Sequence, residues 1–346
     1  MWLPSSLSSS SLPNMMVWPS GACATGAALG YAASAMAVVG VACTVYALHA
    51  VLRFAWVYLL RPASSFKAYN PTGASWAIVT GASEGIGRAF ALSLAKRGMH
   101  VVLVSRSRDK LDAVANDITG LYPKTRTLTI PCDASAPNAV QTVVAALPSD
   151  MDLTVLVNNV GVSEALPSEL STMDPAVIQR IIQVNVTFTT LLTAALIPRL
   201  QHADGRTRAA IINMSSLSAV VPVPLHSVYA GSKAYIDTWS RCLSGELRPY
   251  RFDVLSCTTA YVQTSMSGFR RTSLMVIAPG QAAEDALGKV SCGIASLAPS
   301  AVHAVLQRVS LMLPEKRLAG ILRDKMLTAR RKLLGREAKA QGKKVD

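Results

Sequence analysis

Six short apolar runs, separated by longer helical stretches, constrain the fold of this chain more than any other feature. Runs of this length without polar alternation are typical of strands that are buried on both faces of a parallel sheet. The sequence therefore predicts an α/β fold, a doubly wound parallel sheet with helices on both faces. The expected strands are Trp76–Thr80, His100–Ser105, Thr127–Cys132, Leu153–Asn158, Ala209–Ser215 and Phe252–Thr258. The expected helices are Arg88–Arg97, Asp109–Tyr122, Asn138–Leu147, Pro175–Leu200 and Val228–Tyr250.

The N-terminal region is uncharged and apolar. The first 52 residues contain no Asp, Glu, Lys or Arg, and Gly26–Leu52 is long and apolar enough to span a bilayer. A cleavable signal peptide is the alternative, but it would begin with a basic segment that this sequence lacks. Arg53, Arg61 and Lys67 follow the run, so the positive-inside rule predicts an anchor with the rest of the chain in the cytosol. The shorter apolar run Phe54–Leu60 is expected to lie at the membrane interface.

These features divide the chain into five expected segments. The region after the strands is apolar between Leu287 and Leu313, but Pro299, His303 and Arg308 interrupt it. This pattern favours a buried or interfacial helix pair over a second span. The expected segments are an uncharged N-terminal segment (1–25), the transmembrane anchor and interfacial segment (26–60), a linker (61–73), the α/β domain (74–270), and a helical, membrane-associated region ending in a basic tail (271–346).

The net charge of +14 is concentrated in that tail. Residues 316–346 hold eleven Lys and Arg against three Asp and Glu, a net charge of +8. We therefore expect no nucleic-acid partner; such a tail binds anionic headgroups, or is simply a solvated charged helix. The six cysteines and five histidines are scattered without metal-ligand spacing, so neither a disulfide framework nor a metal site is expected.

A glycine-rich turn follows the first strand. In Thr80-Gly81-Ala82-Ser83-Glu84-Gly85-Ile86-Gly87, the glycines allow the backbone to approach a pyrophosphate at the N-terminus of the next helix. The second strand ends at Arg106, where a site for NAD usually has an acidic residue. Arg106 can pair with the 2′-phosphate of NADP, whereas Arg108 is interpreted as a solvated surface residue. The strand-turn-helix context predicts a Rossmann dinucleotide site that prefers NADPH.

Four further residues form a candidate proton-transfer site. Tyr229 and Lys233 are four residues apart, which places them on one face of a helix. A phenol, with a pKa of about 10, is a poor proton shuttle at neutral pH unless a nearby cation stabilises its phenolate. Ser216 follows the strand Ala209–Ser215 and can donate a hydrogen bond to a reacting carbonyl, and Asn185 lies in the preceding long helix.

Together these motifs resemble the short-chain dehydrogenase/reductase family over roughly residues 74–270. The resemblance implies that Tyr229 is the acid/base, that Lys233 binds the nicotinamide ribose and lowers the tyrosine pKa, that Ser216 polarises the carbonyl and that Asn185 holds a relay water. It also implies an adenine contact for Asp133. The implied cofactor-binding residues are Gly81, Ser83, Gly85, Ile86, Gly87, Arg106, Asp133, Asn159, Gly161, Tyr229, Lys233, Val262 and Thr264.

Other features narrow the resemblance to very-long-chain 3-oxoacyl-CoA reductases. These are Asn158-Asn159-Val160-Gly161, the run Ser105–Leu111, Met214–Ala219 with its Val-Pro-Val-Pro sequel, the anchor and the basic end. The resemblance implies NADPH-dependent reduction of a long-chain acyl-CoA in microsomal fatty-acid elongation, with other elongation enzymes and a second copy of the chain as possible partners. Two alternatives stay open: a 17β-hydroxysteroid or retinoid dehydrogenase with the same four residues, and a catalytically silent scaffold of the elongation complex.

Two features remain. The family usually has Pro-Gly-x-Val-x-Thr after the sixth strand, but here Thr259-Ala260 replaces the proline and glycine, which puts cofactor affinity in doubt. Lys343 and Lys344 lie third and fourth from the end of the sequence, as in a di-lysine signal for the endoplasmic reticulum. With the anchor, this motif predicts an endoplasmic reticulum membrane protein whose catalytic domain faces the cytosol.

Overall fold

The computed structural model describes residues 21–201 and 207–340 and divides into two compact units, residues 1–60 and 61–346. The first unit contains one long helix, α1 (Gly21–Ala55), continued by a π-helical segment, η1 (Trp56–Leu60). The segment Phe54–Leu60 therefore continues the helix.

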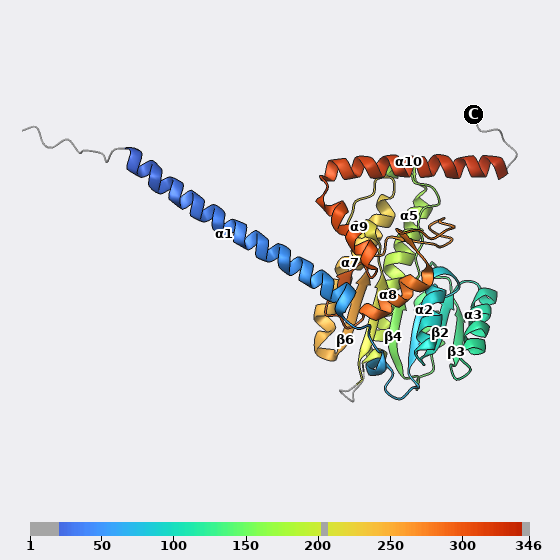
Figure 1. Ribbon diagram of the computed structural model, residues 1–346. Coiled ribbons are helices and arrows are strands. Elements are labelled where there is room, and N and C mark those ends of the chain that lie inside the picture. Colours follow the sequence, from blue (N-terminus) through green and yellow to red (C-terminus); the bar gives the residue numbers. More distant parts are fainter. Residues whose placement is uncertain (1–20, 202–206, 341–346) are drawn as a thin grey trace, which may run out of the picture. The chain divides into compact units, whose positions relative to one another are not determined.

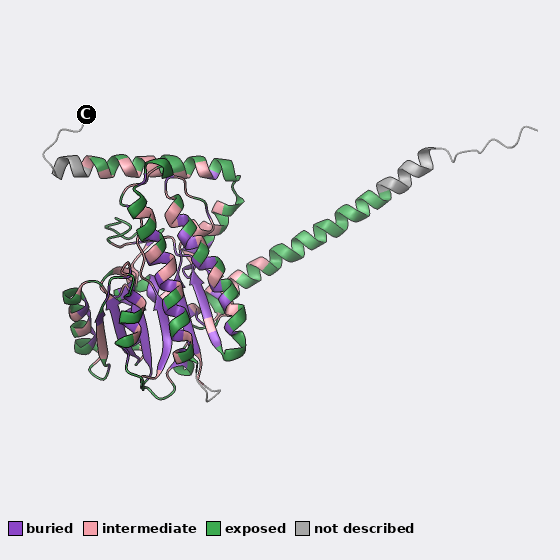
Figure 2. Ribbon diagram, turned by 180° about the vertical axis from the view of Figure 1, so that it is seen from behind, coloured by how far each residue is buried: buried purple, intermediate pink, exposed green. Residues whose placement is uncertain are grey.

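Helix α1 exposes its apolar side chains. The segment Gly30–Leu60 has 31 residues and is long and apolar enough to cross a membrane. Figure 2 shows the described part of this helix as almost entirely exposed. At a rise of about 1.5 Å per residue, this segment is longer than the hydrocarbon core of a bilayer, which is about 30 Å thick. Valine and tyrosine side chains without protein cover, such as Val41 and Tyr46, suit a lipid environment.

The second unit is built on a seven-stranded parallel sheet with the strand order β3-β2-β1-β4-β5-β6-β9. The order reverses between β1 and β4, so the carboxyl ends of these two strands border the crevice in which doubly wound folds bind ligands. The strands are β1 (Trp76–Thr80), β2 (His100–Ser105), β3 (Thr127–Pro131), β4 (Leu153–Asn158), β5 (Ala209–Met214), β6 (Phe252–Cys257) and β9 (Ser296–Leu297).

Helices cover both faces of this sheet (Figure 1). One layer contains α2 (Gly85–Lys96), α3 (Arg108–Leu121) and α8 (Pro279–Lys289). The other contains α4 (Ala139–Ala145), α5 (Pro175–Ile182), α6 (Thr189–Leu200) and α7 (Ser227–Leu247). Because both faces are covered, the central strands β1 and β4 are buried at every residue. The predicted doubly wound fold is confirmed.

The long helix that was expected over Pro175–Leu200 has three parts. Asp174 caps α5, since its carboxylate accepts a hydrogen bond from the Ala176 amide, and Pro175 suits the first turn. A π-helical segment, η4 (Gln183–Phe188), then separates α5 from α6. Such widened turns re-aim side chains and frequently occur at functional sites. The Pro175–Leu200 segment also has the length and apolarity of a membrane span, but it packs on the sheet as a core element.

The region after the sixth strand differs most from the sequence-based expectation. A small parallel pair, β7 (Tyr261–Val262) and β8 (Val276–Ile277), precedes α8, and β9 joins the main sheet before α9 (Ala301–Met312). The expected apolar helix pair over Leu287–Leu313 is therefore wrong, since this segment contains the end of α8, the strand β9 and the helix α9. The basic helix α10 (Glu315–Ala340) follows, and Lys343 and Lys344 lie outside the described residues.

Short 3₁₀ turns complete the unit, and one of them fixes the start of the domain. In η2 (Lys67–Tyr69) the Tyr69 hydroxyl donates a 2.5 Å hydrogen bond to Asp253, which also accepts two hydrogen bonds from Arg208. These contacts hold the expected linker against the beginning of β6. The other turns are η3 (Leu170–Thr172), η5 (Leu217–Ala219) and η6 (Arg248–Tyr250).

Candidate active site

The glycine-rich turn lies at the carboxyl end of β1 and leads into α2. Gly81 has a φ of +67°, which favours glycine. A Cβ atom at Gly87 would lie only 2.0 Å from the Gly81 carbonyl oxygen, so the turn closes tightly on itself. The sequence thus places the N-terminus of α2 directly behind a turn that has no side-chain bulk at these two positions. This is a cradle that suits a pyrophosphate.

Asn159 braces this turn from β4. Its side-chain amide donates hydrogen bonds to the carbonyl oxygens of Thr80 and Gly81 at 3.0 and 3.3 Å. The Thr80 hydroxyl in turn accepts hydrogen bonds from the backbone amides of Asn159 and Val160. Asn159 is a predicted cofactor contact. In the structure its hydrogen bonds hold the carboxyl ends of β1 and β4 together.

A basic residue after β2 and an acidic residue after β3 lie where the adenosine half of the dinucleotide is expected to bind. Arg106 is exposed immediately after β2, and Ser105 donates a 2.9 Å hydrogen bond to Ser83 in the glycine-rich turn. Burial acts to raise the pKa of Asp133, but hydrogen bonds from Ser135 and the positive charge of Arg106 outweigh it and hold that pKa below its usual range. Asp133 is therefore an ionised acceptor beside a cation.

Val262 and Thr264 approach the turn from the opposite side. Val262 is buried in β7, and a Cβ atom at Gly85 would lie 3.2 Å from the Thr264 methyl group. Glu84 accepts hydrogen bonds from Ser265 and Lys110, which lowers the pKa of Glu84 and links the turn to the segment after β7. The structure thus brings together both predicted sides of the dinucleotide site.

The replacement of Pro-Gly by Thr259-Ala260 is accommodated by backbone hydrogen bonds. The Thr259 amide donates to the Cys257 carbonyl at 2.9 Å, a bond that a proline could not make. The Ala260 amide donates to Nδ1 of the buried His303 at 3.3 Å. These bonds fix the backbone path from β6 to β7 in the absence of the usual motif.

Tyr229, Ser216 and Lys233 converge at the carboxyl end of β5. Ser216 is hydrogen-bonded to the Tyr229 hydroxyl group, and it accepts hydrogen bonds from the backbone amide and the hydroxyl of Ser218. Lys233 lies 5.8 Å from the centre of the Tyr229 ring and donates a 2.8 Å hydrogen bond to the Met214 carbonyl. The helical spacing therefore has the predicted effect, because the two side chains of α7 lie close together.

Burial governs the protonation of this group. It raises the pKa of Tyr229, and the negative charge of Glu164 acts in the same direction, while the hydrogen bond with Ser216 lowers it. Burial lowers the pKa of Lys233 to about 8. The net upward shift at Tyr229 differs from the lowering expected from a neighbouring cation. The phenol of Tyr229 is therefore protonated at neutral pH.

Asn185 lies in the π-helical segment and is almost fully buried. Its side chain accepts a hydrogen bond from the Val162 amide and donates to the Val162 carbonyl and to Ser232, at 2.8 to 2.9 Å. Ser232 is hydrogen-bonded to the Tyr229 carbonyl. A Cβ atom at Gly161 would lie 3.3 Å from Lys233 Nζ and 3.4 Å from Asn185 Oδ1, so both polar atoms lie close to the space that a side chain at this position would fill.

Sequence reasoning missed two charged residues of this site. His226 is the N-cap residue of α7, and its ring centre lies 4.6 Å from that of Tyr229. Glu164, three residues after Gly161, lies 2.9 Å from the His226 ring nitrogen. The proximity of His226 to Tyr229 could have been found from their helical spacing. The contact with Glu164 depends on the tertiary structure.

Within the described residues, no group of three or more His, Cys, Asp or Glu side chains lies together as a metal site would require.

Residues 75–274 match the model of the short chain dehydrogenase family. The chain belongs to this family. Two relatives of this short-chain dehydrogenase are fungal proteins named very-long-chain 3-oxoacyl-CoA reductase. The protein from Meyerozyma guilliermondii is 36% identical over 241 residues, which cover 68% of this chain and 70% of the relative. The protein from Lodderomyces elongisporus is 36% identical over 249 residues, covering 69% and 70%.

Solved structures agree with the fold of this short-chain dehydrogenase. A short-chain dehydrogenase from Sphingobium yanoikuyae in complex with NADPH is 26% identical, has a TM-score of 0.59, and covers 70% of this chain and 97% of its own. The structure of a 7β-hydroxysteroid dehydrogenase has a TM-score of 0.66 at 22% identity, covering 73% and 98%, and shows the fold alone. Membership of the family makes the chain an oxidoreductase that uses a nicotinamide dinucleotide, and the tight turn at Gly81 and Gly87 fits that cofactor.

Proposed function

We propose that the chain reduces long-chain and very-long-chain 3-oxoacyl-CoA to 3-hydroxyacyl-CoA with NADPH, the first reduction of microsomal fatty-acid elongation. The observation that carries the proposal is the convergence of Tyr229, Ser216 and Lys233 beside the glycine-rich turn. The names of the fungal relatives supply the substrate class. The proposed catalytic residues are Asn185, Ser216, Tyr229 and Lys233.

The preference for NADPH follows from the residues at the end of β2. The exposed Arg106 guanidinium would pair with a 2′-phosphate, while Asp133 would contact the adenine side. The turn Gly81–Gly87 would hold the pyrophosphate, and Val262 and Thr264 would close over the nicotinamide half. When bound, the reduced nicotinamide supplies the hydride to the substrate carbonyl carbon.

The side chains of the site manage the proton and the developing charge. Tyr229 donates its hydroxyl proton to the substrate oxygen. Ser216 accepts two hydrogen bonds from Ser218, which leaves its hydroxyl hydrogen to donate, and on substrate binding it would donate to that oxygen in place of the Tyr229 hydroxyl. Lys233 and Asn185, whose polar atoms both lie close to Gly161, would return a proton to the phenolate through water.

A membrane location supports this substrate class, because long acyl chains partition into bilayers. We propose that α1 anchors the protein in the endoplasmic reticulum membrane with the second unit in the cytosol. The basic residues of α10 would lie near anionic headgroups or attract the phosphates of CoA. Other elongation enzymes and a second copy of the chain are the proposed protein partners.

The test is NADPH oxidation by the detergent-solubilised full chain with 3-oxoacyl-CoAs of increasing chain length. We expect kcat/KM to increase with chain length and to be at least tenfold higher than with a 17-ketosteroid or a retinal. A preference for the steroid or the retinal would replace the substrate assignment but keep the chemistry. Absence of turnover with every substrate, despite NADPH binding, would support a scaffold instead.

A further inference from the structure

His303 is a fully buried residue of α9 that has no part in the reaction proposed above. Its Nδ1 atom accepts a hydrogen bond from the Ala260 amide at 3.3 Å, and its Nε2 atom lies 3.2 Å from the Met275 carbonyl oxygen. Because a backbone amide can only donate, Nδ1 is the acceptor, and the proton of the neutral ring lies on Nε2, which donates it to Met275. One imidazole ring therefore joins two separate segments of the chain.

The two residues that His303 joins lie at the base of one loop. Ala260 comes directly before β7 and Met275 directly before β8, and these two short strands pair in parallel. The loop between the strands, residues 263–275, therefore starts and ends close to this small sheet. The imidazole ring adds one more connection to the strand pair, on the side from which the chain enters both strands.

The same face of α9 also holds the chain before β7. Gln307, one helical turn after His303, accepts a 2.9 Å hydrogen bond from the Thr258 hydroxyl. Thr258 and Ala260 flank Thr259, so α9 binds the chain on both sides of the position where the family usually has a proline. Hydrogen bonds to α9 thus restrain a segment that a proline would restrain through its fixed φ.

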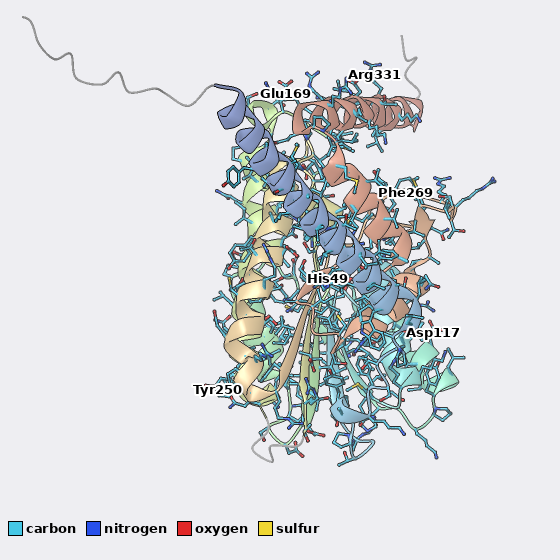
Figure 3. The ribbon with its side chains drawn as sticks, turned by 60° about the vertical axis from the view of Figure 1, so that its left-hand side comes forward. His49, Asp117, Glu169, Tyr250, Phe269 and Arg331 are labelled. Carbon is cyan, nitrogen blue, oxygen red and sulfur yellow. The ribbon has the colours of Figure 1, made fainter. Side chains whose placement is uncertain are left out.

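The loop 263–275 is folded back on itself. The Gln263 side-chain amide donates a 2.8 Å hydrogen bond to the Arg270 carbonyl, across the loop. The Phe269 ring, labelled in Figure 3, packs edge-on against Tyr261 of β7 at a centroid distance of 5.4 Å. Because the loop is held together internally, a shift at its base moves the loop as a unit.

The first residues of the loop contact the glycine-rich turn. The Thr264 methyl group would lie 3.2 Å from a Cβ atom at Gly85, and the Ser265 hydroxyl donates a hydrogen bond to Glu84. The position of the loop base therefore determines how these residues meet the cradle proposed for the pyrophosphate.

We propose that His303 is a positioning residue that clasps the base of the loop 263–275 and thereby holds Val262 and Thr264 against the dinucleotide site. This inference rests on the proposed role of Val262 and Thr264 as cofactor contacts. The proposed catalytic residues come from other elements, among them α7 and η4. The clasp therefore acts on cofactor binding and on the loop, and leaves the chemical step to those residues.

Three substitutions of His303 separate its two hydrogen bonds. His303→Asn keeps an acceptor for the Ala260 amide, because the side-chain amide of asparagine takes the place of Nδ1. His303→Gln keeps a donor for the Met275 carbonyl, because the longer side chain of glutamine reaches the place of Nε2. His303→Phe keeps a ring of similar size and makes neither hydrogen bond.

His100→Phe is the matched control. His100 is also buried, and its Nδ1 atom also accepts a hydrogen bond from a backbone amide, that of Arg126, at 3.1 Å. It is the first residue of β2, so it lies at the amino end of the sheet, away from the carboxyl ends that border the site. This substitution should lower stability without changing the cofactor site.

Two measurements on the detergent-solubilised full chain report on the clasp. Fluorescence titration without acyl-CoA gives the NADPH affinity, and trypsin cleavage after Arg270 or Arg271, which are exposed in the loop, gives the rate of loop opening. His303→Phe should weaken NADPH binding and accelerate this cleavage, each by about tenfold, while kcat at saturating NADPH changes by less than about threefold. His303→Asn should bind NADPH nearly as well as the unmodified chain but be cleaved faster, and His303→Gln should show the opposite pattern.

A purely structural role would lower the melting temperatures of His303→Phe and His100→Phe alike and leave NADPH affinity and loop cleavage unchanged. That result would overturn the proposal, and so would identical behaviour of His303→Asn and His303→Gln. If His303→Phe does not fold, the comparison of the Asn and Gln variants decides the matter alone. Both measurements omit the acyl-CoA, so inactivity of the unmodified chain toward 3-oxoacyl-CoAs would contradict the proposed function and leave the test of the clasp intact.

Discussion

The Nζ atom of Lys233 lies 5.8 Å from the centre of the Tyr229 ring and donates a hydrogen bond to the Met214 carbonyl at 2.8 Å. One turn of helix α7 thus places an ammonium group beside a phenol, and the end of β5 holds it there. The arrangement has a cost in stability, because the ammonium group is buried and its pKa is lowered to about 8.

Lys233→Met should stabilise the protein while it abolishes turnover. Replacing the buried cation removes its desolvation, and the lost hydrogen bond offsets part of the gain. We expect the free energy of unfolding to rise by about 1 to 2 kcal/mol at pH 7. Denaturant unfolding of the solubilised chain measures this quantity.

The pH dependence gives this prediction its sign. The folded-state pKa of Lys233 lies below its ordinary value of 10.5, so the folded chain binds fewer protons than the unfolded chain between pH 8 and that value. The stability of the unmodified chain therefore rises with pH across this window, and the advantage of Lys233→Met should shrink. The exposed Lys124→Met is the control, and an advantage independent of pH would contradict the account.

Arg106→Asp should reverse the cofactor preference. Removing the guanidinium group, and adding a charge that repels the 2′-phosphate, should raise the KM for NADPH by about tenfold to a hundredfold with little change for NADH. Arg108→Ala is the matched variant, because Arg108 is also exposed and pairs with Asp112 at 3.6 Å. Steady-state kinetics with both cofactors measure the ratio. An equal effect of the two substitutions would show that the contact is not specific.

Gly87→Ala should abolish NADPH binding. The added Cβ atom would lie 2.0 Å from the Gly81 carbonyl oxygen, so the turn must open and the pyrophosphate cradle is lost. Gly120→Ala in α3 is the control, since no heavy atom lies within 4 Å of its Cβ position. The control should gain about 0.5 to 1 kcal/mol of stability from helix propensity. Fluorescence titration measures the NADPH affinity of both variants. Unchanged affinity in Gly87→Ala would contradict the proposal that this turn binds the pyrophosphate.

The sheet could be predicted because its six long strands are continuous apolar runs, and the first, second and fourth begin and end as expected. The seventh strand was not predicted, because Ser296–Leu297 is too short to have a periodic pattern. The convergence of Tyr229 and Lys233 is a local consequence of helical spacing, so the sequence suffices. The contact between Glu164 and His226 joins two segments that are distant in sequence, and the widened turn at Asn185 has no sequence signature; both depend on tertiary packing.

The proposed role of α1 as a membrane anchor can be tested by extraction of the protein from membranes. Val41→Arg combined with Val45→Arg places two charges in the middle of α1, where each costs about 3 kcal/mol in a bilayer. We expect the double variant to be extracted from microsomes by alkaline carbonate, whereas the unmodified chain stays in the pellet. Leu121→Arg, at an exposed position of the second unit, should remain membrane-bound. Retention of the double variant would show that α1 is not the anchor.

The central claim is that Tyr229 donates the proton to the reduced carbonyl, and Tyr229→Phe tests it most directly. The variant loses one hydroxyl group and keeps the ring that packs against His226. With the solubilised chain, NADPH and 3-oxopalmitoyl-CoA, the account predicts that kcat falls by about a hundredfold to ten-thousandfold while NADPH affinity is unchanged. Turnover within a factor of about two of the unmodified chain would contradict it.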